Sequence, residues 1–547
     1  MKALTVALIA VGLAAASHGA AGAPTKPMPL IEGLGAHTRK VTTDSAEAQR
    51  YFDQGLNFLF GFNHGAAIRS FEEAARLDPE CAMAHWGVAL ASGPHINFPM
   101  VPPPAAERAW RELGRAQAAK HVSPVEQALI GALARRYANP QPDDRAPLDL
   151  AYANAMREVW RKYSDDTDVG VLFVEAMMDL RPWDQWTPEG QPQPGTDEIL
   201  ATLDRVLALD VNHPFANHLY IHAVEASPHP ERAIAAADRL LGLQPGLAHN
   251  VHMPSHIYIR VGRWHDAIAS NVKAVAADQA YRKVAGPARG FLPVYVAHNQ
   301  HMLAYAAMMT GQGQLALRHM RDLVAGLSDE FMAEYGAMSE AWLSMPLECM
   351  VRFGRWDDVL AEPEIDAKYP FSHAFRFAAR SIAYAAKGDP VRARAEQALF
   401  AEAAKKVPAD EIAAGNNLCS AVLAIVTPMV EGEILVREGK VDAAVAQLRA
   451  AVAAEDALRY DEPPSWIIPV RHSLGATLMA HGRFADAEKV YREDLTRLPG
   501  NGWSLYGLSE ALAQQQKVAE AAEAKRQFTD AWHVADITIS SSCLCQP

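Results

Sequence analysis

Cysteine is scarce in this sequence. The chain has five cysteines in 547 residues, too few for the disulfide frameworks that hold small secreted domains together. Two of them, Cys543 and Cys545, form a C-x-C motif that could bind a soft metal or take part in redox chemistry. A segment of this kind is more often a frayed tail, and we expect residues 536–547 to be one.

The short motifs of common enzyme classes are also missing. The sequence has no P-loop, no G-x-G-x-x-G after a strand, no G-x-S-x-G and no H-E-x-x-H. It has no stripe of basic residues, and its formal net charge is -13. We therefore expect no nucleic-acid partner, and any chemistry has to come from residues outside these motifs.

Long hydrophobic runs are confined to the beginning of the chain. Lys2 is followed by an apolar run over residues 3–16 and then by small residues up to Ala23. This order is typical of a secretory signal peptide, and the run is shorter than the roughly 20 residues of a membrane-spanning helix. We expect residues 1–23 to be a signal peptide and the mature chain to be secreted, into a bacterial periplasm. No later segment indicates a membrane span, so we expect no membrane anchor after cleavage.

What the sequence does contain is an internal repeat. Small, aromatic and alanine residues recur at fixed spacings at Gly55, Phe58, Ala67, Phe71, Ala74 and Pro79, and again, with one departure, at Gly475, Leu478, Ala487, Tyr491, Asp494 and Pro499. This pattern resembles the tetratricopeptide repeat (TPR), a helix–turn–helix unit of about 34 residues. The resemblance implies an all-α, TPR-type solenoid, because each helix pair can bury its apolar face only against its neighbours.

The repeat pattern divides the chain into regions. A glycine that ends a first helix recurs at Gly262, Gly354, Gly388, Gly439 and Gly482. The expected organisation is N-terminal TPR units at 45–94, an irregular helical region with loops at 95–210, histidine-rich TPR repeats at 211–330 and C-terminal TPR repeats at 331–535. In such a solenoid the first helices line a concave surface, which is the usual binding surface.

Histidines are concentrated in the middle repeats. Ten of the 21 histidines lie between positions 213 and 301: His213, His218, His222, His229, His249, His252, His256, His265, His298 and His301. Spacings of three and four residues place side chains on one face of a helix. His213, His229 and His265 fall outside the common face, and we expect them in turns or at the surface.

The register of the repeat aims the other histidines at one space. Ala233, Ala267 and Ala316 occupy the position of the conserved TPR alanine after the turn. The resemblance then places seven histidines on the concave face of three successive first helices: His218, His222, His249, His252, His256, His298 and His301. Glu225 is on the same face and could be a ligand or a general base. We predict that these seven histidines bind a transition metal, and that Glu225 is the catalytic group of any reaction.

Three further residues have groove positions in this register. Arg260 could hold an anionic group, and Tyr305 and Trp86 also face the concave side. His95 and Asn97, in the segment after Trp86, and Trp183 could lie over the near end of the groove. For Trp183 we expect a place in the core instead.

The metal and its geometry stay open at this point. Imidazole with a carboxylate suits zinc, copper or iron, and the seven histidines could serve two ions. Met253 and Met302 would suit copper, but they are more typical of core residues. Pro254 is tolerated only near a helix start, so the helix that carries His256 is expected to be kinked or to begin late, which counts against two ions.

The most specific prediction from sequence is therefore an exported TPR protein whose groove binds a transition metal, with or without catalysis. The alternatives are a metal-free groove for a small molecule, peptide or partner protein, and a purely structural hydrogen-bond network. The segments HPFANHLYIHAVEAS, HMPSHIYIRVGR and HNQHMLAY resemble a group of secreted bacterial TPR proteins. This resemblance implies no particular reaction.

Overall fold

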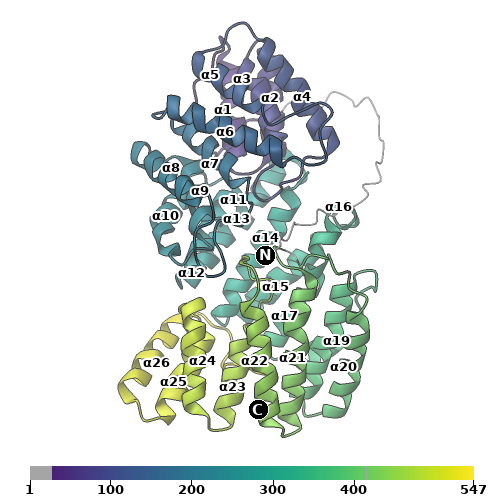
Figure 1. The fold of residues 1–547 in the computed structure, drawn as a ribbon. Helices are drawn as coiled ribbons and strands as arrows, with labels where there is room; N and C mark the ends of the chain where they lie inside the picture. Colours follow the sequence, from purple (N-terminus) through teal and green to yellow (C-terminus); the bar gives the residue numbers. More distant parts are fainter. Residues whose placement is uncertain (1–27, 414, 547) are drawn as a thin grey trace.

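The chain folds into a continuous stack of helices. The computed structural model describes residues 28–413 and 415–546, so the expected signal peptide at 1–23 lies outside the described residues. Within the described part of the chain there are only isolated β-bridges and no strand. Figure 1 shows α1–α6 at the top, α9–α14 and α16 at mid-height and α19–α26 at the bottom. The expected all-α solenoid is confirmed.

The first part of the stack contains eight helices. They are α1 Ala46–Phe60, α2 His64–Leu77, α3 Ala82–Ala91, α4 Pro103–Ala118, α5 Pro124–Leu133, α6 Ala146–Lys162, α7 Thr167–Met178 and α8 Thr196–Leu209. The region 95–210 is thus largely helical, with loops at 92–102, 134–145 and 179–195.

The middle part holds the histidine-rich segment. Its helices are α9 Pro214–Val224, the 3-10 helix η1 Pro230–Ala233, α10 Ile234–Leu243, α11 Ala248–His252, α12 Pro254–Arg260, α13 Trp264–Ala285, α14 Leu292–Met309 and α15 Gly313–Ala325. Each first helix is followed by a second helix that packs against it. Ala233, Ala267 and Ala316 are fully buried, as the TPR register requires.

The last part of the chain forms the C-terminal end of the stack. Its helices are α16 Asp329–Ser339, the 3-10 helix η2 Glu340–Ser344, α17 Met345–Arg352, α18 Trp356–Ala361, α19 Pro370–Ala386, α20 Pro390–Ala404, α21 Cys419–Arg437, α22 Val441–Asp456, α23 Val470–Ala480, α24 Phe484–Arg497, α25 Gly502–Gln514 and α26 Val518–Trp532.

The final repeats fold back onto the middle repeats. The indole Nε1 of Trp264 donates to the carbonyl oxygen of Pro499 at 2.7 Å. The indole of Trp503 donates to the carbonyl of Met308, also at 2.7 Å. Because the stack curls back in this way, its C-terminal part packs against the middle repeats.

Turns between paired helices follow the expected glycine pattern. Gly262, after α12, has φ +80°, a left-handed conformation that L side chains rarely adopt. It allows Arg263 N–H to donate to the Tyr258 carbonyl at 2.7 Å, which closes the end of the helix. The same positive φ occurs at the other four turn glycines.

The expected break at Pro254 is present. Proline cannot donate the backbone hydrogen bond that a continuous helix needs at this point, and the segment is divided into α11 and α12 at Met253. His249 and His252 lie on α11, whereas His256 lies on α12. The break therefore lies between His252 and His256.

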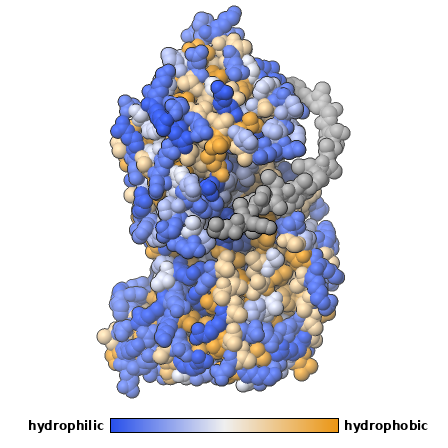
Figure 2. Space-filling view, in the orientation of Figure 1, coloured by the Kyte–Doolittle hydropathy of each residue, from blue (hydrophilic) through white to orange (hydrophobic). Residues whose placement is uncertain are grey.

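One helix departs from the expectation that no later segment resembles a membrane span. By length and composition, α21 could cross a membrane. It is nevertheless mostly buried in the structure and packs against α19 and α22, which explains its apolar sequence as that of a core helix. Figure 2 shows a largely hydrophilic exterior with hydrophobic residues grouped over parts of the lower half.

The expected frayed tail was wrong. Residues 538–546 contain no helix, yet Cys543 and Cys545 are buried. Both oxygens of the Asp536 carboxylate accept backbone hydrogen bonds at the start of α15, from Gly313 at 2.7 Å and Gln314 at 2.8 Å. The tail is held because it satisfies polar groups inside the last repeats. Its sequence has no periodic pattern from which these contacts could be predicted.

Candidate metal centre

A first group of three imidazoles lies where α9 meets α11. His218, His222 and His249, which we call trio 1, each offer a ring nitrogen, and these nitrogens lie within 4.8 Å of one another. Nε2 of His249 is 3.2 Å from Nε2 of His218. Nε2 of His222 is buried and has no hydrogen-bond partner in the described structure.

A second group lies immediately beside the first. His252, His256 and His298, which we call trio 2, come from α11, α12 and α14, and their ligand atoms also lie within 4.8 Å of one another. The Nε2 atoms of His252 and His256 are 2.7 Å apart. The ring centroids of His252 and His298 are 4.6 Å apart. His249 and His252, both on α11, belong to different trios, whereas His252 and His256, on either side of the break at Met253, belong to the same one.

In each trio, one histidine has its outer ring nitrogen fixed as a proton donor by an acceptor behind it. Nδ1 of His218 lies 2.8 Å from the carbonyl oxygen of Phe60, which can only accept. Nδ1 of His252 lies 2.7 Å from Oδ1 of Asn271. The amide nitrogen of Asn271 donates to the Ala267 carbonyl at 2.8 Å, which sets the orientation of the Asn271 side chain. In metal-binding histidines, the ring nitrogen that does not bind the metal usually donates a hydrogen bond to an acceptor of this kind.

Glu225 connects the two trios. One carboxylate oxygen accepts from Nδ1 of His222 at 2.7 Å, and the other accepts from Nδ1 of His256 at 2.5 Å. Glu225 is 1% exposed. Both oxygens are thus engaged behind the imidazoles, so the carboxylate is placed to orient ligands rather than to act as a ligand or general base.

In trio 2 these contacts leave two lone pairs facing each other. With protons on Nδ1, neutral His252 and His256 both present Nε2 lone pairs across 2.7 Å. Only a shared proton or a metal ion relieves this repulsion. Two nitrogens bound to one tetrahedral ion at 2.0–2.1 Å lie about 3.3 Å apart, which the pair can reach by a small movement.

Burial keeps these imidazoles neutral. It lowers the pKa of His218, His249, His252 and His298 well below the usual value, and neighbouring histidines add to the effect. Burial also lowers the pKa of His222. Neutral imidazole is the form that binds metal ions, so these five imidazoles are in the binding form at neutral pH.

Glu225, in contrast, is held as an anion. Burial disfavours its charge, but His256 and His222 outweigh this effect and lower its pKa to about 2. No lysine or arginine in the described part of the chain forms an ion pair with it; its close partners are the two histidines, and the Tyr460 hydroxyl lies 3.5 Å from Oε2. A buried carboxylate is costly unless positive charge lies close by, and a metal ion in either trio would add such charge.

A cavity of 480 Å³ lies beside the centre. It is bounded by the loop 183–190, the segment 455–466 and the final repeats, and Arg260 and Tyr305 line it. The Arg260 guanidinium stacks over the ring of Tyr460, 5.2 Å from its centroid, and makes no ion pair with any described residue. Arg260 and Tyr305 are therefore both in the cavity where the sequence placed a ligand.

The wall between cavity and trios is built from aromatic residues. The expectation that Trp183 is a core residue was wrong: it lines the cavity, and its ring stands edge-on to His222 at 5.3 Å. Its indole donates to Oδ1 of Asn97 at 3.0 Å, and the Asn97 amide donates to the Tyr295 hydroxyl at 3.1 Å. The ring of Tyr295 in turn packs on His249 at 4.5 Å. Asn97 thus does lie over the near end of the groove.

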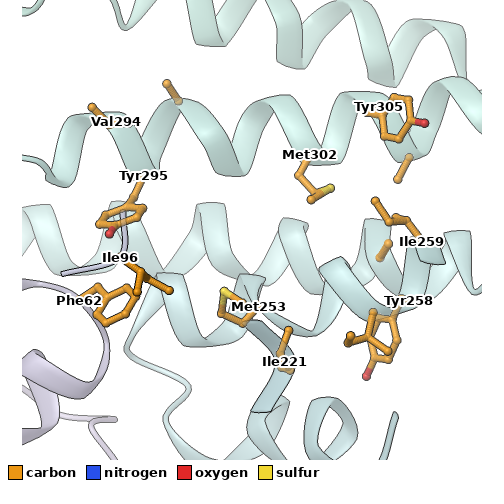
Figure 3. Close-up of a cluster of buried hydrophobic side chains, with 14 of the residues drawn as sticks. Phe62, Ile96, Ile221, Met253, Tyr258, Ile259, Val294, Tyr295, Met302 and Tyr305 are labelled. Atoms are coloured by element: carbon orange, nitrogen blue, oxygen red, sulfur yellow. The ribbon is translucent and has the colours of Figure 1, made fainter. Parts of the chain in front are cut away.

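Several expected residues lie outside the two trios. His301 is buried, but its ring faces Trp342 at 6.5 Å and it belongs to neither trio. Trp86 is buried in α3, and no aromatic contact in the described residues joins it to the trios. Met253 and Met302 are fully buried core residues, and Figure 3 shows them among apolar side chains.

A separate histidine cluster escaped the sequence analysis. His213 was expected in a turn or at the surface but is fully buried, and its Nε2 donates to Asp168 at 3.0 Å. His37 contacts the same carboxylate oxygen at 2.9 Å, and Arg39 donates to the other at 3.0 Å. With a guanidinium already bound to Asp168, this cluster is an ion-pair network that fastens the segment before α1 to α7. His229 is exposed, as expected.

Comparison with known proteins finds only distant structural likenesses. No family model matches the chain, and no curated protein matches its sequence. Among solved structures, the TPR domain of P58(IPK) is 12% identical over 89% of this chain and 93% of that chain, with a TM-score of 0.20. A human IFIT1 dimer with PPP-AAAA is 12% identical over 89% and 91%, with a TM-score of 0.31. Yeast Tom70 is 10% identical over 88% and 90%, with a TM-score of 0.26. At this level the likeness concerns helical-repeat architecture alone.

Proposed function

We propose that this chain is a metal-binding helical-repeat protein with a two-ion histidine centre. The observation that carries the proposal is the pair of Nε2 lone pairs on His252 and His256, 2.7 Å apart, with both Nδ1 atoms committed elsewhere. A shared proton would also relieve this pair. A metal ion explains more, because a third imidazole, His298, is directed at the same point and trio 1 repeats the arrangement next to it.

Zinc, copper and iron are the candidate ions. Each trio offers three neutral nitrogen donors, with no thiolate and no carboxylate among them, and imidazole suits all three metals. Affinity at such a site rises towards copper in the divalent series, so copper should bind most tightly. A three-histidine site leaves a coordination position open for water or a substrate.

The cavity is the proposed place for a small molecule. Arg260 brings a positive charge without a carboxylate partner, Tyr305 and Trp183 bring aromatic surface, and Trp183 separates the cavity from His222. In this proposal, Arg260 holds an anionic or polar group of the ligand and Trp183 excludes water from the trios. Glu225 keeps His222 and His256 in the tautomer that binds metal.

We also propose that the protein is exported and that it belongs with the secreted bacterial TPR proteins that its histidine segments resemble. The support is the signal-peptide pattern of residues 1–23. Expression of the full chain in a Gram-negative bacterium, followed by fractionation, tests this proposal. Recovery of the chain with its N-terminus still present in the cytoplasm would contradict it.

Elemental analysis of the purified mature protein tests the metal centre. About two equivalents of transition metal per chain, bound or bindable under reducing or oxidising conditions, are expected. The alternative function is a metal-free scaffold whose concave surface binds a peptide or partner protein. Absence of any bindable metal under both conditions would favour that alternative.

A further inference from the structure

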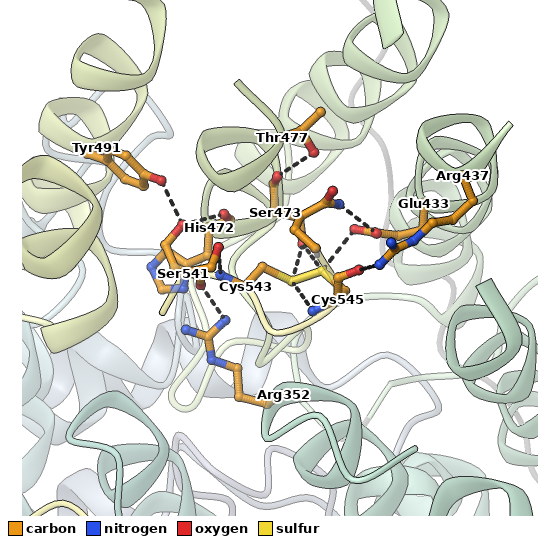
Figure 4. Close-up of a disulfide and its surroundings, with 12 residues drawn as sticks. Arg352, Glu433, Arg437, His472, Ser473, Thr477, Tyr491, Ser541, Cys543 and Cys545 are labelled. Carbon is orange, nitrogen blue, oxygen red and sulfur yellow. Dashed lines mark hydrogen bonds between the residues drawn. A yellow bond between two sulfur atoms is a disulfide. The ribbon is translucent and has the colours of Figure 1, made fainter. Parts of the chain in front are cut away.

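The C-terminal tail lies inside the groove of the last repeats. Arg437, on α21, donates to the backbone carbonyl of Cys545 at 2.7 Å, and Arg352, on α17, donates to that of Ser542 at 3.3 Å. The Ser542 hydroxyl donates to the carbonyl of His472, on α23, at 2.9 Å. Residues on three first helices, α17, α21 and α23, therefore hold the tail (Figure 4).

This position brings a disulfide next to a buried carboxyl group. Cys543 and Cys545 are joined by a disulfide bond. Sγ of Cys545 lies 3.1 Å from Oε1 of Glu433, and the Ser473 hydroxyl lies 3.3 Å from Sγ of Cys543. The tail also engages the other oxygen of Glu433 through the amide of Gln546, at 2.9 Å.

The two sulfur atoms have different surroundings. Cys543 is 6% exposed and Cys545 is 2% exposed, and only Cys545 contacts Glu433. Burial raises the pKa of Glu433 to about 7, although Arg437 and Ser473 oppose the rise. A carboxyl group of this kind can give up or accept a proton near neutral pH.

A purely structural role explains this disulfide poorly. The bond closes a loop with one residue between the cysteines, and the stabilisation that a disulfide gives by restricting the unfolded chain is smallest for the shortest loops. The hydrogen bonds from Arg352 and Arg437 already hold the tail. A stabilising role also has no need for a buried acid at one of the two sulfurs.

We propose that Cys543 and Cys545 form a thiol–disulfide exchange site, with Glu433 as the proton donor and acceptor for Cys545. The co-reactant is a dithiol, on a small molecule or on another protein. The site is separate from the histidine centre and does not depend on metal binding there.

The exchange proceeds in two balanced steps. A thiolate of the dithiol attacks Sγ of Cys543, the sulfur that makes no hydrogen bond with Glu433; the Cys543–Cys545 bond breaks, and Cys545 leaves as a thiolate that takes the proton of Glu433. The second thiol of the dithiol, after losing its proton, attacks the mixed disulfide and releases Cys543, which takes a proton from solvent. The dithiol is oxidised by two electrons and the protein disulfide is reduced. Because residues 538–546 contain no helix, the tail can lift to admit the dithiol without unfolding a repeat.

Reduction of the folded mature protein by dithiothreitol tests the proposal. The thiols of Cys543 and Cys545 are trapped with a maleimide and quantified in the C-terminal peptide by mass spectrometry, while circular dichroism confirms that the fold persists. The rate, divided by the concentration of dithiothreitol thiolate, should fall as the pH rises through about 7, the pKa of Glu433.

Glu433→Gln should lower this rate at pH 6 by at least about ten-fold, within the usual range for general acid catalysis, and should abolish its dependence on pH. The matched control is Glu348→Gln, which alters another buried groove carboxyl away from the sulfurs and should leave the rate unchanged. A disulfide that resists dithiothreitol in the folded protein would overturn the proposal on the native chain alone. An unchanged rate in Glu433→Gln, or a reduced pair that retains zinc and does not re-form the disulfide with oxidised dithiothreitol, would also overturn it.

Discussion

The ring of Trp183 stands edge-on to the ring of His222, with an interplanar angle of 81° and centroids 5.3 Å apart. Trp183 holds this position with a backbone φ of +59°, a conformation that costs a residue other than glycine on the order of 1–3 kcal/mol. The hydrogen bond from its indole to Asn97 maintains the arrangement. Strain of this kind is kept where a side chain has to occupy one particular place, here between the cavity and trio 1.

Trp183→Ala is expected to open trio 1 to the cavity. The protein should still bind about two metal ions, because no ligand is lost, but it should release metal to a chelator roughly ten times faster, since the apolar shell around a site controls solvent access. Stopped-flow mixing with a chromogenic chelator measures the rate. Trp110→Ala is the control, because Trp110 is 43% exposed on α4. Equal release rates in all three proteins would contradict the role given to Trp183.

Loss of the facing imidazoles should remove one ion. The double replacement His252→Ala and His256→Ala leaves trio 1 intact and should reduce the metal content from about two to about one equivalent per chain, because a lone His298 cannot hold an ion. Elemental analysis after dialysis measures the change. His229→Ala, at an exposed histidine paired with Glu231, should retain full stoichiometry. Unchanged stoichiometry in the double variant would show that trio 2 is not a metal site.

The repeat register accounts for most of what the sequence could predict. Alanine at the crowded helix contact and glycine at a left-handed turn are each required by local sterics, so their spacing fixes the phase of every first helix. Six of the seven expected histidines consequently lie in two trios. The seventh, His301, shares a helix with His298 but turns its ring towards Trp342. The repeat register predicts on which side of a helix a residue lies, but it does not predict the direction in which its ring points.

Other parts of the site depend on contacts between distant segments. Phe60 contributes a backbone carbonyl, which any residue type could supply. Asn271 and Trp183 meet the histidines only because α13 and the loop 183–190 fold against α9 and α11. The docked tail satisfies Glu433 and the carbonyl of His472, partners that lie 112 and 70 residues away along the chain. Pairings over such separations leave no periodic signal in one sequence.

Glu225→Gln tests the carboxylate behind both trios. The amide keeps the shape but loses the negative charge and one of the two acceptor oxygens, so it can no longer hold His222 and His256 equally in the metal-binding tautomer. Loss of such a contact typically weakens metal affinity by about 10–100-fold, and both ions should be affected because Glu225 touches both trios. Competition with a chelator of known affinity measures the change. Glu231→Gln, at a surface carboxylate, should leave affinity unchanged; weakening of only one ion would contradict the bridging role.

His301 offers a test of burial without metal binding. Burial lowers its pKa from 6.5 to about 3, so between these values the unfolded chain binds a proton that the folded chain does not. Its contribution to stability is therefore complete above pH 6.5 and is lost progressively as the pH falls towards 3. At pH 5 the loss is about 2 kcal/mol, from about 1.5 pKa units at 1.36 kcal/mol each. His301→Leu removes the titrating group, so the difference in unfolding free energy between pH 8 and pH 5 should shrink by about that amount.

Urea unfolding of the chelator-treated protein measures this difference, with His229→Leu as an exposed control that should keep the native difference. An unchanged difference in His301→Leu would mean that the imidazole is protonated inside the fold, which a ring without a hydrogen-bond partner at Nε2 should not be.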